Sequence, residues 1–317
     1  METVIEAQAL TKRYPTRNGK NAIANLDFSI SKGQLYGLVG PDGAGKTTTL
    51  RILSTVMTQS SGSAHIAGYN IKTEAEKIRS RIGYMPQNFS LYPDLSVMEN
   101  LIFFANLNHV TKEKKKSRIP EMLAFTRLDR FHSRRAGKLS GGMKKKLALA
   151  CALMHSPEVL LLDEPSTGVD PVSRRELWSI LSEVVEQGVT VMVSTPYMDE
   201  AERCHQVGML YQGQLLTSGK PEDLEAQLPF EIVEVKASPR KAMRSIVRQT
   251  KDILEWRPVG DRLRLAVPNT NSTVKHMLTG LNSRFRKNGL NVQILRQSKK
   301  TMEDVFVYRV AEQRTKA

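Results

Sequence analysis

Eight consecutive residues near the start of the chain have types and spacing suited to holding phosphate groups. The segment Gly40-Pro41-Asp42-Gly43-Ala44-Gly45-Lys46-Thr47 fits the pattern G-x-x-x-x-G-K-[ST]. Its glycines allow backbone N–H groups to curl around a β-phosphate, and the positive end of a following helix adds to that anion site. Lys46 is expected to reach the β- and γ-phosphates, and the Thr47 hydroxyl to bind Mg²⁺. The sequence therefore predicts a phosphate-binding loop with a magnesium site.

An apolar run that ends in two carboxylates is the second chemical feature. Val159-Leu160-Leu161-Leu162-Asp163-Glu164 reads as a buried strand, which would place Asp163 beside the metal through water at the carboxyl edge of a sheet. Glu164 is then free to polarise an attacking water. Taken alone, this pattern is also that of a strand and a polar turn, but beside a phosphate loop it favours a hydrolytic site.

A serine and two glycines precede a long helical pattern and form a third candidate site. In Leu139-Ser140-Gly141-Gly142-Met143, Ser140 is expected to cap the helix, with a bare glycine backbone beside it. This arrangement suits a second anion, although it is equally that of a plain capped helix.

Strands and helices alternate around these motifs. Apolar runs at 34–39, 82–84, 159–162 and 189–193 are separated by helical patterns at 46–53, 97–108, 140–155 and 171–187. This alternation predicts an α/β domain with a mainly parallel sheet. Further strands are expected at 3–10 and 26–31, with a hairpin at 207–216 that turns at Gln212-Gly213. The segment from about 89 to 157 is almost entirely helical and reads as an insertion.

A different pattern of predicted strands and helices begins after Pro229, which follows a helix expected at 221–228. Strands are predicted at 230–236, 254–257, 263–267 and 292–296, and helices at 239–250 and 273–287. The order βαββαβ predicts a small α+β domain of the split-βαβ type. We therefore expect two domains, at 1–228 and 229–317.

Composition sets limits on the class of protein. The chain has 317 residues, of which 40% are hydrophobic and 25% charged, as in globular proteins. Its net charge of +15 favours anionic partners. Cys151 and Cys204 supply neither a disulfide framework nor a zinc site, which suits a reducing compartment. No signal peptide and no membrane span are evident, so we expect any membrane role to come through a partner.

The order of these motifs resembles the nucleotide-binding subunit of an ABC transporter. The phosphate loop, Gln87, the LSGGM segment, the LLLDEP strand and the turn Ser166-Thr167-Gly168-Val169-Asp170 cover residues 1 to about 220. The resemblance implies a P-loop NTPase fold with a helical subdomain. It also implies ATP and Mg²⁺ as ligands, and a second ABC ATPase domain, in a homodimer or a heterodimer, facing this one head to tail. Ser140, Gly141 and Gly142 would close on ATP held by the opposite phosphate loop.

The resemblance also implies roles for single residues. Tyr14 would stack on adenine, although a tyrosine packed at a strand end is the alternative, and Thr48 would join Thr47 at the phosphates. Gln87 would sense Mg²⁺ and the attacking water, and Asp170 would communicate between the two ATP sites. The implied catalytic residues are Glu164, Lys46 and Gln87, and the implied metal ligands are Thr47, Gln87 and Asp163.

One position departs from the family pattern. Where the family has a histidine that touches the γ-phosphate, this chain has Pro196, which has no side-chain donor. His205 lies nine residues later, and we do not expect it to substitute. We therefore predict slow or asymmetric hydrolysis.

The motifs further resemble the multidrug or antibiotic-export branch of the family, including daunorubicin-resistance ATPases and tandem exporter ATPases. The segment 301–307 resembles part of the accessory C-terminal domain of that branch, which acts in dimer contact or regulation, or only stabilises the fold. The resemblance implies an integral-membrane permease as partner and a peripheral position on the cytoplasmic face of the inner membrane. Two alternatives are an ABC ATPase that acts on nucleic acid or the ribosome, which we do not favour, and a binding module with little hydrolysis.

Overall fold

The computed structural model describes residues 2–15, 21–88, 91–269 and 271–316. The chain divides into two compact units, of which the first ends at Pro221 and the second covers Glu222–Lys316. The predicted fold class, an α/β P-loop domain with a helical subdomain and a small α+β domain, is confirmed by the elements of these units.

A six-stranded, mainly parallel sheet is the framework of the first unit. Its order is β10-β9-β3-β8-β7-β6, and only the β9–β10 pair is antiparallel. The central strands β3, β7 and β8 are buried at every position, which explains their continuous apolar runs. The strands are β3 (Leu35–Val39), β6 (Ile82–Met85), β7 (Val159–Asp163), β8 (Thr190–Thr195), β9 (Gln206–Tyr211) and β10 (Gln214–Gly219).

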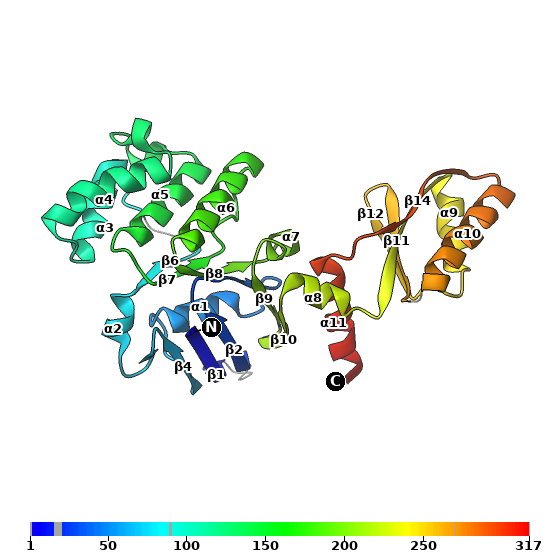
Figure 1. Ribbon diagram of the computed structural model, residues 1–317, viewed down its shortest axis with the longest axis horizontal. Coiled ribbons are helices and arrows are strands. Elements are labelled where there is room, and N and C mark those ends of the chain that lie inside the picture. Colours follow the sequence, from blue (N-terminus) through cyan, green and yellow to red (C-terminus); the bar gives the residue numbers. More distant parts are fainter. Residues whose placement is uncertain (1, 16–20, 89–90, 270, 317) are drawn as a thin grey trace. The chain divides into compact units, whose positions relative to one another are not determined.

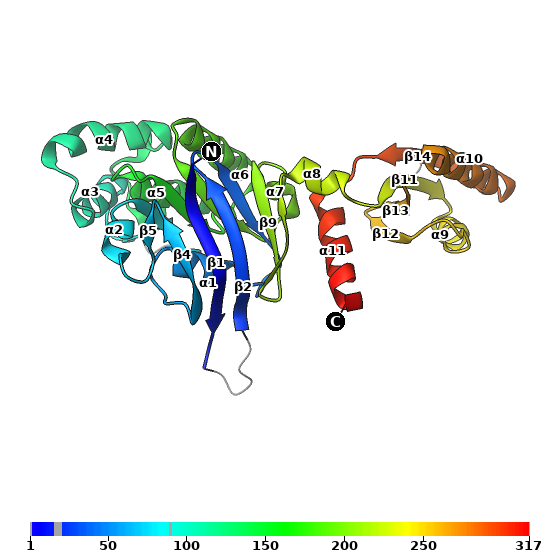
Figure 2. The same cartoon turned by 60° about the horizontal axis from the view of Figure 1, so that its bottom comes forward.

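A second, antiparallel sheet has the order β2-β1-β4-β5, and its strands β2, β1 and β4 lie side by side in Figure 2. The two sheets share one apolar core with the helix α1 (Lys46–Leu53), whose Leu50 and Leu53 are fully buried. The strands are β1 (Thr3–Arg13), β2 (Asn21–Ser31), β4 (Ser61–Ile66) and β5 (Tyr69–Asn70), and α2 (Ala75–Arg79) follows them. β1 and β2 are longer than predicted, because their mutual pairing extends into polar residues.

Helices α3, α4 and α5 pack on one another and are grouped in Figure 1. The capping box of Ser96 and Glu99 starts α3, and Thr111 and Ser140 cap α4 and α5. The helices of this unit after α2 are α3 (Val97–Leu107), α4 (Lys112–Phe125), α5 (Gly141–Leu153), α6 (Pro171–Glu186) and α7 (Met198–Ala201). The helix α8 (Pro221–Ala226) spans the boundary between the two units.

The second unit has the predicted βαββαβ order. Its four antiparallel strands are arranged β12-β13-β11-β14, and α9 and α10 pack on one face of this sheet around Val233, Leu265 and Phe285. The elements are β11 (Phe230–Ser238), α9 (Arg240–Arg248), β12 (Glu255–Val259), β13 (Arg262–Pro268), α10 (Asn271–Lys287), β14 (Asn291–Ser298) and α11 (Met302–Lys316). The helix α11 was not predicted from the sequence.

Candidate active site

The phosphate loop joins β3 to α1, as its motif requires. Gly45 has φ 111°, and a Cβ atom there would lie 2.6 Å from the Ala22 carbonyl oxygen. A Cβ atom on Gly40 would lie 2.1 Å from the Leu210 carbonyl oxygen. Only glycine fits either position, so the backbone of the loop is held by close packing on β9 and β2.

Lys46 folds back across this loop and is 3% exposed. Its Nζ donates to the carbonyl oxygens of Gly40 (2.8 Å) and Pro41 (3.1 Å) and lies 3.3 Å from Glu164 Oε1. Asp42 Oδ1 lies 3.9 Å from the same nitrogen but is almost fully exposed. The Lys46 ammonium group therefore lies where the phosphate loop meets the end of β7.

Asp163 ends β7 beside the start of α1. Its Oδ1 accepts hydrogen bonds from Thr47 Oγ1 (3.1 Å) and Ser194 Oγ (2.6 Å). Its Oδ2 is buried and has no hydrogen-bond partner among the described residues. A hydroxyl and a carboxylate with one unpaired oxygen are a donor set that fits Mg²⁺. Thr48 is the next residue of α1 and is half-buried.

Glu164 is 5% exposed and has an unusual backbone conformation, with φ 48°. Its N–H donates to Ser194 Oγ (3.0 Å), which fixes the backbone. Its Oε2 accepts from Gln87 Nε2 (2.9 Å) and Thr167 Oγ1 (3.2 Å). Non-glycine residues rarely adopt positive φ, and those that do cluster at functional sites. The structure thus brings together Lys46, Gln87 and Glu164, from three separate segments.

Lys145 is a member of this cluster that the sequence did not reveal. Its Nζ donates to the backbone carbonyl oxygens of Gln87 (3.1 Å) and Glu164 (3.4 Å). Burial lowers the pKa of this lysine, and the charges of Glu164 and Asp163 partly offset that effect. Because Lys145 belongs to α5, it connects the helix that follows Ser140 to the backbone of Gln87 and Glu164.

Replacing Lys145 with methionine removes both hydrogen bonds and keeps the length of the side chain. We expect kcat to fall by about tenfold with little change in KM. The lost hydrogen bonds contribute roughly 1.5 kcal/mol to holding Glu164 in place for the reaction, and they do not contribute to ATP binding. Steady-state ATP turnover at a series of ATP concentrations measures kcat and KM. An equal effect from the exposed Lys116→Met would show that lost charge, and not orientation, is responsible.

Ser140, Gly141 and Gly142 lie at the start of α5. The Ser140 hydroxyl accepts from the Met143 N–H (3.3 Å), and both Ser140 and Gly141 are exposed. Gly142 is buried, and a Cβ atom there would lie 2.4 Å from the Ser173 side chain. Among the described residues, no hydrogen bond or ion pair joins Ser140 to the phosphate loop of its own chain. Gly141 lines a depression that Gln87 and Lys145 also line.

Tyr14 borders a surface depression that the phosphate loop and the β9–β10 turn also line. Its hydroxyl donates to the Met57 sulfur (3.3 Å), and its ring is half-buried. The Gly213 N–H donates to the Ala44 carbonyl oxygen (3.0 Å), so the predicted turn at Gln212-Gly213 packs on the loop. A second aromatic residue, Tyr211, lines the same depression and was missed in the sequence.

Pro196 and His205 lie at different ends of the parallel sheet. Pro196 follows the last residue of β8, near the carboxyl ends of the strands. His205 Nδ1 accepts the Leu35 N–H (3.0 Å) at the start of β3, which is the end away from the phosphate loop. His205 is therefore engaged elsewhere and does not replace the missing histidine.

This combination of a phosphate loop, an acidic strand end and a helical subdomain defines a P-loop ATPase. The family model described as "ABC transporter" matches residues 23–167. The Nod factor export ATP-binding protein I of Burkholderia pseudomallei is 38% identical over 233 residues, covering 73% of this chain and 76% of that protein. The chain belongs to the ATP-binding proteins of the ABC transporter family.

Further similarities extend this result. The probable multidrug ABC transporter ATP-binding protein YbhF of Escherichia coli is 49% identical over 223 residues. These residues are 70% of this chain but only 38% of that relative. A solved ATP-binding subunit of an ABC transporter is 28% identical, with a TM-score of 0.64, and 71% of this chain and 92% of that one are covered.

A dimeric ATP-binding cassette in a post-hydrolysis state, bound to ADP and Pi, is also similar. It is 27% identical with a TM-score of 0.63, over 68% of this chain and 98% of that one. Within the described part of this chain, no helix is both long and apolar enough to cross a membrane.

Proposed function

We propose that this chain binds and hydrolyses ATP with Mg²⁺ to energise a membrane exporter, with drugs or other hydrophobic compounds as the transported class. The observation that carries the hydrolytic part is the contact of the buried Glu164 and Lys46 with each other and of Glu164 with Gln87, at the end of β7. The exporter part is supported by the names of the relatives, which are a multidrug transporter component and a Nod factor exporter component.

The proposed reaction gives each polar side chain a role. Glu164 accepts a proton from a water molecule, whose oxygen attacks the γ-phosphorus. The bond from that phosphorus to the bridging oxygen breaks, and ADP leaves with the electron pair. Lys46 binds the β- and γ-phosphate oxygens, and Gln87 orients the water. Bound Mg²⁺, held through Thr47, Asp163 and Gln87, supplies positive charge at the phosphates.

The proposed assembly is a pair of ATPase domains, identical or different, with an integral-membrane permease. Its support is the exposure of Ser140 and Gly141, whose backbone is free to meet another chain, and the dimeric state of a similar cassette. In this assembly the Ser140–Gly142 segment binds ATP held by the opposite domain, and Asp170 communicates between the sites. Tyr14 stacks on adenine in the depression beside the loop. The complex then lies at the cytoplasmic face of the inner membrane.

Turnover of Mg-ATP by the purified chain, alone and with its membrane subunit, tests this function. We expect phosphate release in at least the second condition, and its loss in the variants discussed below. ATP binding without turnover in both conditions would contradict hydrolysis and favour a binding module that needs a second ATPase.

Introducing a histidine at Pro196 tests the effect of the missing side chain. We expect Pro196→His to raise kcat by about tenfold, since one hydrogen bond to a charged group contributes roughly 1.5 kcal/mol or more. Single-turnover phosphate release measures the chemical step directly. An unchanged rate would show that Pro196 does not limit hydrolysis.

A further inference from the structure

The helices α9 and α10 carry basic side chains and no acidic ones. Four lie on each helix, and we call their exposed surface the basic helical face. By contrast, the lysine-rich helix α4 also contains Glu113 and Glu121. The residues of the basic helical face are Arg240, Lys241, Arg244 and Arg248 on α9 and Lys275, Arg284, Arg286 and Lys287 on α10.

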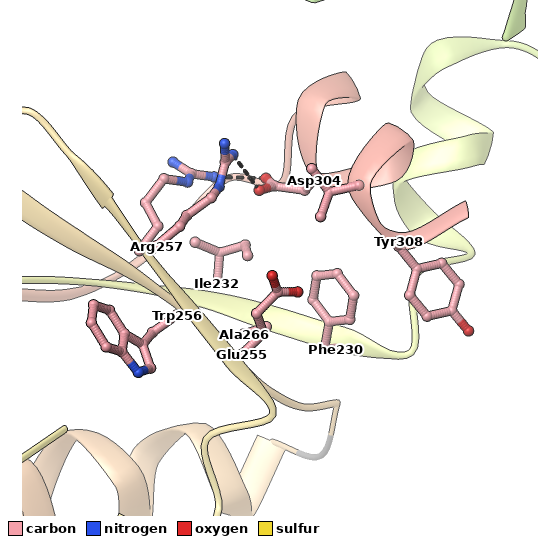
Figure 3. A pocket seen from close by; sticks show the side chains of 10 residues that line it. Phe230, Ile232, Glu255, Trp256, Arg257, Ala266, Asp304 and Tyr308 are labelled. Carbon is pink, nitrogen blue, oxygen red and sulfur yellow. Dashed lines mark hydrogen bonds and ion pairs between the residues drawn. The ribbon is translucent and has the colours of Figure 1, made fainter. Parts of the chain in front are cut away.

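On the face of the sheet that lies away from α9 and α10, arginine side chains form ion pairs with acidic residues. Arg264 contacts Asp304 (2.8 Å) and Glu234 (3.3 Å), and Arg257 contacts Asp304 (2.8 Å). Figure 3 shows Arg257 and Asp304 meeting beside the apolar slot under α11. Arg296 also pairs with Glu234 (3.2 Å). Arginines on this face are therefore neutralised within the fold.

Most residues of the basic helical face lack such partners. Arg284 donates to Thr250 Oγ1 (3.1 Å), and the Arg248 guanidinium lies over the Trp256 ring at 5.7 Å. The other six are exposed and make no ion pair or side-chain hydrogen bond with any described residue. Asp252, the acid that follows α9, makes no ion pair with them in the described part of the chain. Two adjacent helices thus present uncompensated positive charge.

We propose that the basic helical face binds the anionic headgroups of a lipid surface. Charge complementarity is the main argument, because clustered lysine and arginine side chains bind acidic lipid at a membrane surface. A second copy of this face would be repelled by like charge. Of the two aromatic rings among the described side chains of α9 and α10, Phe285 is fully buried and the His276 imidazole is exposed, so the two helices offer no run of exposed rings for stacking successive nucleic-acid bases. The choice of lipid also rests on the proposed function, which places the chain at a membrane.

Co-sedimentation of the full chain with vesicles tests this proposal without nucleotide, so that it is independent of hydrolysis. We expect binding to phosphatidylcholine vesicles that contain phosphatidylglycerol, none to pure phosphatidylcholine, and weakening by salt. The variant Lys241→Gln/Arg244→Gln/Lys275→Gln/Arg286→Gln is expected to bind about 10²- to 10³-fold more weakly, given four lost charges. Retained binding by this variant would overturn the proposal.

Two matched variants complete the test. Arg244→Lys/Arg286→Lys keeps the charge and is expected to keep binding, and both altered chains are checked by thermal melting. Lys112→Gln/Lys114→Gln/Lys116→Gln removes three exposed charges from α4 and is expected to bind normally. If only this α4 variant loses binding to anionic vesicles, the lipid-binding site lies on α4 and the proposal is overturned. Tighter binding to duplex DNA or RNA than to anionic vesicles would also overturn the proposal. ATP turnover, measured separately, reports on the proposed function.

Discussion

Replacing Glu164 with glutamine is expected to lower kcat by about 10²- to 10⁴-fold while ATP still binds. An amide has nearly the same shape as the carboxylate but does not accept the proton of the attacking water. The neighbours Gln87 and Thr167 lie within hydrogen-bond distance of this side chain, so its position should change little. Phosphate release under saturating ATP measures kcat, and calorimetric titration measures the dissociation constant.

The exposed Glu183 on α6 provides the control, because Glu183→Gln removes the same charge away from the cluster. We expect that variant to turn over ATP at the original rate. Normal turnover by the Glu164→Gln chain would assign the base to another group and remove the main support for the proposed chemistry.

The change Lys46→Ala is expected to weaken ATP binding by about 10²-fold or more, because charge-assisted hydrogen bonds to the phosphates are lost. It also leaves the buried Glu164 carboxylate without its cation, 3.3 Å away in the original chain. Breaking a buried ion pair in this way lowers the free energy of unfolding by about 3 kcal/mol. Nucleotide titration and chemical denaturation measure the two effects.

A double variant separates the two causes. In Lys46→Ala/Glu164→Gln the side chain at position 164 no longer carries a charge that needs the lysine, so we expect stability to return in part while ATP binding stays weak. If the double variant is as unstable as Lys46→Ala alone, the loss comes from packing of the lysine side chain and not from its charge.

The features that could be predicted are those that short motifs and buried runs specify. The helix α1 has the predicted bounds 46–53, because a glycine-rich loop, Lys46 and the apolar residues that follow leave little choice of register. Likewise, β7 is apolar at each position up to Asp163, which placed the carboxylates at the edge of the sheet. The βαββαβ order followed from alternating periods in the C-terminal part.

The features that were missed depend on partners far away in the chain. In α11 the apolar residues from Val305 to Tyr308 are consecutive, so the sequence lacks the spacing of three to four residues that predicts a helix with one buried face. The strand β4 is rich in small and polar residues, and its conformation comes from pairing with β1. Lys145 reaches carbonyl groups 58 and 19 positions away, and no local pattern predicts such contacts.

The backbone of Glu164, at φ 48°, is strained at the residue whose side chain forms the buried ion pair with Lys46. A left-handed conformation at a non-glycine position costs about 1–3 kcal/mol, and glycine would avoid most of that cost. Glycine would also leave the buried Lys46 ammonium group without its carboxylate, which costs about 3 kcal/mol and offsets the relief of strain. Heat-resistant variants of this ATPase are therefore expected to arise at other positions, and any programme to stabilise the protein has to hold position 164 fixed.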